Sequence, residues 1–265
     1  MRFTRLVAAA CALPLAAAAT LLGTSAADAT GSAYAALGDS YSAGVGAGDY
    51  AGSSGGCRRS TKAYPQLWAA AHAPSSFAFT ACDGATTTDV INNQLGPLSQ
   101  STSLVSITAG ADDAGFASVM TTCVLSSDTV CLNRIAQAED YFRGTLQSRL
   151  DHVYSVIRAK APAARVVVLG YPRFYQLNGS CRAGMSEAKR SAVNRAADEV
   201  DSVIARRAAD HGFTFRDVRR AFAPHEICGG HPWLHSVTVP LGDSYHPTAE
   251  GQSSGYLPEF TAAAR

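Results

Sequence analysis

The sequence predicts a single α/β domain in which a central parallel sheet lies between two layers of helices. Strand-like apolar runs alternate with helical patterns along most of the chain, an order typical of parallel sheets covered by helices. Residues 166–169 are apolar at every position (VVVL), as expected of a strand that is buried on both faces. These two observations indicate a three-layer α/β/α architecture.

The first 29 residues are expected to form a signal peptide that lies outside this domain. Arg2 and Arg5 give a basic start, residues 6–22 are apolar and rich in alanine, and residues 27–29 (ADA) form a small-residue cleavage pattern. A membrane anchor is the alternative, but the apolar stretch is short and ends in that pattern. Residues 30–265 then form one domain of a secreted protein.

The strands and helices are expected in alternation. The two clearest helical patterns have apolar residues at positions 146, 150, 153 and 157, before Pro162, and at positions 193, 197, 200 and 204. Ser186 is a suitable cap for the second helix, and Gly212 is a suitable stop. The five expected strands are residues 33–37, 77–81, 104–108, 165–170 and 213–217.

The mature chain is expected to carry equal numbers of basic and acidic residues, which limits the kinds of partner it binds. The leader removes Arg2, Arg5 and Asp28, so that of 22 basic and 21 acidic residues 20 of each remain. A chain without excess positive charge is not expected to bind nucleic acid as its main partner. A neutral or amphiphilic small molecule is compatible with this composition.

Cysteine usage agrees with export. Of the seven cysteines, Cys11 leaves with the leader, and six in a secreted chain suggest three disulfides. Six cysteines allow about 15 pairings. We favour the pairing of neighbours in order, which gives Cys57–Cys82, Cys123–Cys131 and Cys181–Cys228.

The candidate chemistry lies at the two ends of the domain. Ser40 follows the first predicted strand, and sites in parallel sheets form at the carboxyl ends of strands. A serine hydroxyl is a weak nucleophile until a base takes its proton, and His246 is the best candidate base. Asp243 precedes it by three residues, so on a helical turn the carboxylate would orient the ring. The alternative is that Ser40 only caps a helix and that residues 243–246 form a surface turn.

Four short blocks resemble those of the SGNH (GDSL) hydrolase family. They are GDS at residues 38–40, CDGA at 82–85, GADDAGF at 110–116 and DSYH at 243–246. The blocks occur in the family's order across residues 34–251, and with six cysteines the chain resembles the secreted actinobacterial lipases, esterases and phospholipases A1 of this family. The resemblance implies an SGNH hydrolase domain and a serine esterase that uses no cofactor.

The resemblance also implies roles for individual residues. Ser40 would be the nucleophile and would donate its backbone N–H to an oxyanion hole, and Gly84 would donate a second N–H. His246 would be the general base and then the general acid, oriented by Asp243. In some relatives a backbone carbonyl two residues before the histidine orients it instead, which here would be that of Ser244.

One position departs from the family pattern. The third oxyanion donor of the family is an asparagine side chain, and the matching residue here is Asp112. An ionised carboxylate only accepts hydrogen bonds, so it would repel a developing oxyanion. Three hypotheses follow: burial keeps Asp112 protonated and able to donate, the hole works with two backbone donors, or the chain is catalytically impaired.

The segment around residues 225–235 has two interpretations. His225, Cys228, His231 and His235 are close together, but a disulfide on the cysteine and the lack of an HExxH pattern argue against metal, so no metal site is expected. A stapled loop near the active site is the better interpretation. Trp233 and Leu234 would then line an acyl pocket, the alternative being that Trp233 is a core residue.

Together these features predict a secreted, monomeric serine esterase acting on lipid or acyl-glycerol esters, with phospholipase A1 activity inside that class. Transient contact with a lipid interface is expected of such an enzyme. A carbohydrate acetyl esterase is one alternative. A catalytically impaired protein that binds esters or lipids is the other, because Asp112 replaces the usual asparagine.

Overall fold

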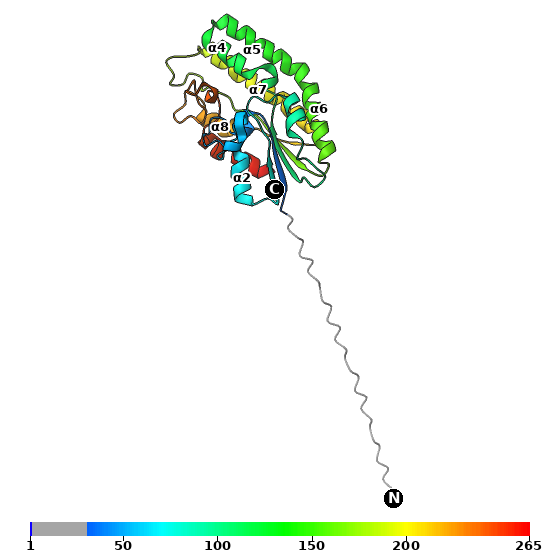
Figure 1. Ribbon diagram of the computed structural model, residues 1–265. Helices are drawn as coiled ribbons and strands as arrows, with labels where there is room; N and C mark the ends of the chain where they lie inside the picture. The colour runs from blue at the N-terminus through cyan, green and yellow to red at the C-terminus, as the bar shows by residue number, and fades with distance from the viewer. Residues whose placement is uncertain (2–30) are drawn as a thin grey trace. The chain divides into compact units, whose positions relative to one another are not determined.

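The computed structural model describes Met1 and residues 31–265, so the predicted signal peptide lies outside the described residues. Its centre is a five-stranded sheet in the order β2-β1-β3-β4-β5, with every neighbouring pair parallel (Figure 1). All five strands predicted from the apolar runs are confirmed. Their bounds are β1 (Ala33–Gly38), β2 (Ser76–Phe79), β3 (Leu104–Thr108), β4 (Arg165–Leu169) and β5 (Thr214–Arg216).

Helices cover both faces of the sheet, which confirms the three-layer architecture. On one side α7 contacts β4 and β5 and packs against α5 and α6, and on the other α9 contacts the same two strands and packs against α2 (Figure 1). The helices are α1 (Ser40–Ala43), α2 (Tyr64–His72), α3 (Thr87–Asp89), α4 (Phe116–Leu125), α5 (Asp128–Arg143), α6 (Thr145–Lys160), α7 (Glu187–Asp210), α8 (Arg219–Phe222) and α9 (Leu257–Ala263).

The two clearest helical patterns become α6 and α7. The predicted apolar stripe of α6 is fully buried, and the helix ends at Lys160, two residues before Pro162. The Ser186 side chain caps α7 by accepting a hydrogen bond from the Lys189 N–H at 3.3 Å. Gly212 follows that helix in a left-handed conformation, with φ of 67°. Local signals therefore determine where these helices begin and end.

Three disulfides join cysteines that are neighbours in the sequence: Cys57–Cys82, Cys123–Cys131 and Cys181–Cys228. The first ties the loop after residue 50 to the loop after β2, and the second joins α4 to α5. Each bridge therefore holds a connection near the carboxyl edge of the sheet or between packed helices.

No helix among residues 31–265 is long and apolar enough to cross a membrane. No group of three or more histidine, cysteine or acidic side chains in this part of the chain is arranged to hold a metal ion.

Candidate active site

Ser40 is presented by a tight transition from β1 to α1. Gly38 has φ of 119°, and a Cβ atom there would lie only 2.2 Å from the Thr108 carbonyl oxygen, so only glycine fits. Asp39 caps the short helix by accepting the Tyr41 N–H at 3.0 Å, and the Tyr171 hydroxyl donates to the same carboxyl group. Ser40 is thus the first residue of α1, held by buried contacts on both sides.

The structure brings Ser40 and His246 together across 206 positions of sequence. The Nε2 atom of His246 lies 2.8 Å from Ser40 Oγ. The loop that carries the histidine is fixed to the serine's helix, because the Tyr41 hydroxyl donates to the Tyr245 carbonyl at 2.6 Å. On the other side of the loop, the His235 N–H donates to the His246 carbonyl at 3.0 Å. This geometry suits proton transfer from the hydroxyl to the ring.

The His246 ring is uncharged at neutral pH because its pKa is lowered. Burial lowers the pKa of its ring to about 4, and the positive charge of Arg58 acts in the same direction. The Ser244 carbonyl faces the ring and opposes this shift in pKa. That contact falls short of a well-formed hydrogen bond, and Nδ1 has no other partner among the described residues. At neutral pH the imidazole is uncharged and able to accept a proton.

The Asp243 carboxylate makes no hydrogen bond to the His246 ring, so the prediction that it orients the ring is corrected. Its Oδ1 atom accepts hydrogen bonds from Arg58 and, at 3.0 Å, from the Tyr50 hydroxyl. The reason lies in the backbone: Tyr245 has φ of 66°, so the helical turn assumed from the spacing is broken between the two residues. The Asp243 side chain therefore affects the His246 ring through its charge, and the Asp243 carbonyl accepts the His246 backbone N–H at 3.2 Å.

Arg58 joins two loops that border the site. Its guanidinium donates to Asp83 at 3.2 Å and to the Gly242 carbonyl at 3.2 Å, in addition to its bond with Asp243. Asp83 precedes Gly84, while Gly242 and Asp243 belong to the loop that leads to His246. The arginine therefore links the segment of the candidate oxyanion hole to the segment of the candidate base.

Gly84 and Asp112 both border the same cleft as Ser40 and His246. Gly84 has φ of 70°, a conformation that favours glycine and turns the backbone at this point. The neighbouring Asp113 fixes the two loops to each other, since its carboxylate accepts the Thr87 N–H at 2.9 Å. The four family-like blocks thus converge on one place.

The Asp112 carboxyl has a raised pKa. Burial, the largest cause, and the negative charges of Asp83, Asp113 and Asp89 together raise its pKa to about 7. No hydrogen bond to its side chain occurs within residues 31–265. The group therefore changes charge near neutral pH, beside the serine.

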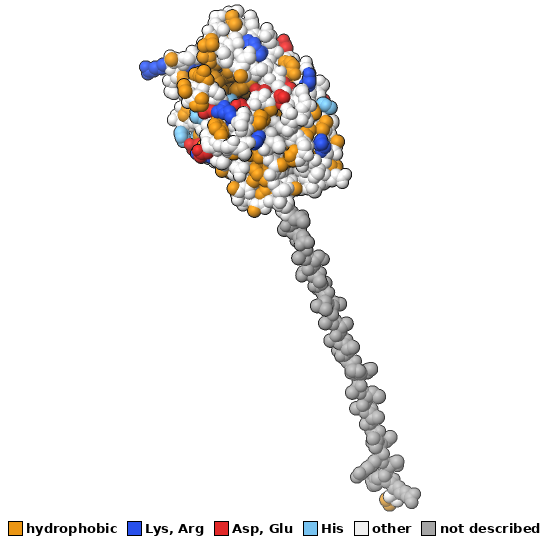
Figure 2. Space-filling view, in the orientation of Figure 1, with side chains coloured by type: hydrophobic (Ala, Val, Ile, Leu, Met, Phe, Trp, Pro, Cys, Tyr) orange, Lys and Arg blue, Asp and Glu red, His pale blue; other side chains and the backbone are white. Residues whose placement is uncertain are grey.

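The cleft in front of these residues has a volume of about 470 Å³. Its walls are mostly apolar and come from one face of α4 and from the loop of residues 237–246. Hydrophobic side chains gather at the end of the molecule where α4 lies (Figure 2). The apolar wall residues are Phe116, Ala117, Met120, Val124, Leu125, Val237, Leu241 and Tyr245.

Trp233 and Leu234 do not line this cleft, so the prediction that they form the acyl pocket is corrected. The Trp233 ring stacks on His225, with 3.5 Å between ring centroids, and packs edge-on against Phe222. Leu234 is only 2% exposed and pairs with Pro247. Both residues support the loop of His246 from behind, which agrees with the alternative interpretation of Trp233 as a packing residue.

Sequence reasoning missed three residues that shape the site. Arg58 could have been found from the predicted Cys57–Cys82 disulfide, because that bond puts it beside Asp83. Tyr41 lies directly after the candidate nucleophile, but its bond to residue 245 spans 204 positions and has no local signal. Phe116 ends the third block, and only the fold shows that its ring lies 6.1 Å from that of His246.

The comparisons with known proteins agree with this geometry. The model of the GDSL-like Lipase/Acylhydrolase family matches residues 36–253. Lipase 1 of Streptomyces coelicolor is 60% identical over 269 residues, with all of both chains covered. The phospholipase A1 structure from Streptomyces albidoflavus NA297 is 60% identical, with a TM-score of 0.87 over 88% of this chain and 100% of that one.

A second solved structure, an extracellular lipase from Streptomyces rimosus, is also 60% identical. It has a TM-score of 0.86 and covers 88% of this chain and 99% of that one. The family match spans most of the chain and includes all four convergent blocks. The chain therefore belongs to the GDSL-like lipase/acylhydrolase family of serine ester hydrolases.

Proposed function

We propose that this protein is an exported lipid esterase that works through an acyl-enzyme on Ser40. The observation that carries the proposal is the 2.8 Å contact between Ser40 Oγ and the neutral, buried His246 ring, at the floor of an apolar cleft. A nucleophile within hydrogen-bond reach of its base is the arrangement that covalent acyl transfer requires. The 60% identical extracellular lipase of Streptomyces rimosus supports export. In this proposal residues 1–29 are removed and residues 30–265 form the active enzyme.

The reaction follows from the positions of these atoms. Ser40 Oγ attacks the ester carbonyl carbon as its proton passes to His246 Nε2, and the carbonyl oxygen becomes an oxyanion. The oxyanion collapses, the C–O bond to the alcohol breaks, and the histidine returns the proton to the departing alcohol. Water then attacks the acyl-serine by the same route, which releases the carboxylic acid and restores Ser40.

The surrounding residues supply orientation and charge stabilisation. The Ser244 carbonyl, rather than Asp243, faces the His246 ring and favours the protonated state that forms during attack. The backbone N–H groups of Ser40 and Gly84 stabilise the oxyanion as preorganised donors. Asp112 acts as a third donor while it is protonated, below its pKa of about 7.

The cleft favours lipid esters over acetylated carbohydrates. A carbohydrate acetyl esterase would need a shallow polar pocket, whereas this cleft has a volume of about 470 Å³ and its walls are mostly apolar, with Phe116, Met120 and Leu241 among them. The named relatives support the same choice, since they are lipases and a phospholipase A1. All candidate catalytic groups come from one chain, so we propose that the monomer is the active form.

The mouth of the cleft is also suited to a lipid surface. Large exposed apolar side chains among the described residues concentrate there, at the end of α4 and in the loop of residues 237–241. Leu125 is 78% exposed and Leu241 is 72% exposed, and both line the cleft. Exposed apolar patches of this kind mark contact sites for membranes or partners. We therefore propose that the rim of the cleft rests on the lipid aggregate.

Replacing Leu125 and Leu241 together with serine should weaken binding to phosphatidylcholine vesicles by roughly tenfold or more, because the apolar area transferred to the lipid is lost. Binding is measured by vesicle sedimentation in a Ser40→Ala background, so that the lipid is not consumed. Leu177→Ser is the matched control, since Leu177 is 41% exposed and does not line the cleft. Equal binding of the double variant and the control would exclude the rim as the docking surface.

A fluorophosphonate probe tests catalysis against simple lipid binding. The probe reacts only with an activated serine, so we expect one stoichiometric adduct on the peptide that contains Ser40 and none in Ser40→Ala. A protein that bound esters without catalysis would stay unlabelled at every pH. That result would favour the impaired, lipid-binding alternative that Asp112 suggests.

A further inference from the structure

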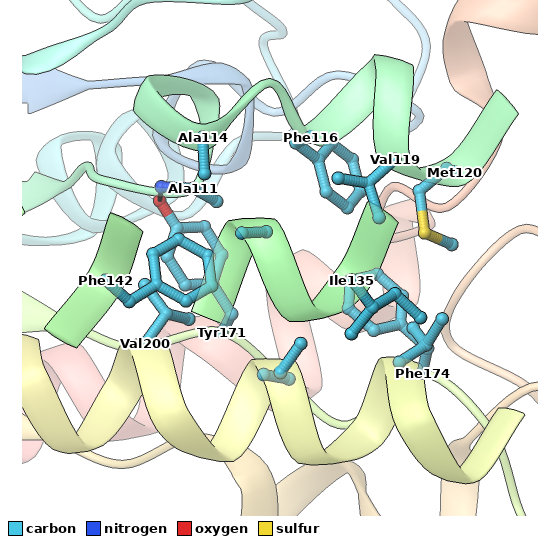
Figure 3. Close-up of a pocket in the computed structure, with 14 residues that line it drawn as sticks. Ala111, Ala114, Phe116, Val119, Met120, Ile135, Phe142, Tyr171, Phe174 and Val200 are labelled. Atoms are coloured by element: carbon cyan, nitrogen blue, oxygen red, sulfur yellow. Dashed lines mark hydrogen bonds between the residues drawn. The ribbon is translucent and has the colours of Figure 1, made fainter. Parts of the chain in front are cut away.

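A small apolar cavity lies behind the wall of the cleft. It has a volume of about 50 Å³ and lies between α4, α5 and α7, with Tyr171 and Phe174 on its border (Figure 3). The one hydroxyl on its border is occupied, because Tyr171 donates to Asp39 and accepts the Ala111 N–H at 3.2 Å. A cavity without free polar groups is dry and accommodates apolar guests.

Two side chains of α4 are common to the cavity and the cleft. Phe116 and Met120 line both spaces and lie one helical turn apart on the same face of α4. The Phe116 ring lies 6.1 Å from the His246 ring on one side and 5.7 Å from the Phe174 ring on the other, centroid to centroid. The partition next to the candidate base is therefore a single layer of side chains.

The side chains of Phe116 and Met120 can change conformation at low cost. Met120 has an unbranched, flexible thioether side chain that adopts several shapes at low cost. Phe116 is in the first turn of α4 and is only partly buried. A rotation of either side chain would connect the cleft to the cavity without any change in the backbone.

We propose that the cavity is the terminal part of the acyl site. The acyl chain of an ester bound at Ser40 passes between Phe116 and Met120, and its end lies between α5 and α7. This inference rests on the proposed function and adds a determinant of chain length to it. A water-sized group needs about 10–15 Å³ of such space, so the cavity holds about three to five methylene groups. Each methylene buried there should raise kcat/KM by about fourfold.

Ala197→Leu tests this assignment by filling the cavity from its far side. Ala197 is on α7, is 4% exposed and lines the cavity but not the cleft. We expect the ratio of kcat/KM for p-nitrophenyl decanoate to that for the butyrate to fall by at least tenfold. Ala188→Leu, an exposed position on the same helix, is the matched control and should leave both rates unchanged. A ratio within twofold of the parent value for Ala197→Leu would overturn the proposal.

A second variant and a crystal structure test the proposal independently, in case Ala197→Leu does not fold. Ala138→Leu fills the same cavity from α5 and should lower the ratio in the same way. In a crystal structure of the protein inhibited with a decyl phosphonate on Ser40, the alkyl chain should pass Phe116 into the cavity. A chain that instead runs along the open cleft toward Leu125 would overturn the proposal. If the parent protein does not hydrolyse the butyrate ester, the proposed function itself is wrong. That result is distinct from an unchanged ratio in the variants, which would contradict only the acyl-site proposal.

Discussion

Replacing His246 with alanine should lower kcat for p-nitrophenyl butyrate by about 10⁴–10⁶, whereas Asp243→Asn should lower it by less than about tenfold. The histidine is the group within 2.8 Å of Ser40 Oγ, so no other described side chain is placed to take the proton. The Asp243 carboxylate is bound by Arg58 and Tyr50, and the ring of the histidine faces the Ser244 carbonyl. We therefore expect the site to work as a pair of residues and not as a triad.

The contrast between the two variants is informative because serine hydrolases with a true triad behave differently. There, replacement of the orienting aspartate by asparagine costs about 10⁴ in kcat. A loss of that size in Asp243→Asn, with an unchanged thermal unfolding midpoint, would show that the aspartate orients the histidine during turnover. The unfolding control is needed because Asp243 also anchors Arg58, whose contacts with Asp83 and Gly242 remain.

Asp112→Asn should raise kcat/KM at pH 9 by about 10–100-fold and leave it nearly unchanged at pH 5. The pKa of the Asp112 carboxyl is raised to about 7, first by burial and then by neighbouring carboxylates. Below that pH the group is neutral and donates a hydrogen bond to the oxyanion, and above it the charged group repels the oxyanion. Loss of one oxyanion donor costs about 10²–10³ in rate. Asparagine donates at every pH, so the difference between the two proteins appears only as the pH rises.

The pH dependence of kcat/KM provides the measurement. In the parent protein activity should rise through the pKa of His246, at about 4, and fall through that of Asp112, at about 7. In Asp112→Asn the acid limb should stay and the alkaline fall should vanish. An alkaline plateau in the parent protein would mean that two backbone donors suffice. Equal rates of the two proteins at pH 9 would place Asp112 outside the oxyanion hole.

The sequence was sufficient for features that depend on local or regular signals. The apolar run at residues 166–169 predicted a strand buried on both faces, and β4 is the fourth strand of a five-stranded sheet. The cap at Ser186 and the break at Pro162 placed the ends of two helices. The pairing of Ser40 with His246 was also predicted, because Ser40 was expected at the carboxyl end of the first strand and His246 was the best candidate base.

The features that sequence reasoning missed depend on backbone conformation or on contacts between distant residues. Asp243 and His246 have the spacing of a helical turn, but the left-handed conformation of Tyr245 separates their side chains. Trp233 was expected near substrate because of its position in the chain, and instead its ring has a packing partner in His225. The sequence of α4 did not indicate that its apolar face lines a cleft, because the same pattern is typical of a helix face buried in the core.

The central claim is that ester hydrolysis passes through a covalent acyl group on Ser40. The most direct measurement is to quench the reaction with p-nitrophenyl butyrate in acid within milliseconds and to analyse the peptides by mass spectrometry. We predict a butyryl ester on the peptide that contains Ser40, formed together with a burst of p-nitrophenol, and neither signal in Ser40→Ala. Steady turnover with no acyl adduct, or an adduct on a different residue, would contradict this mechanism.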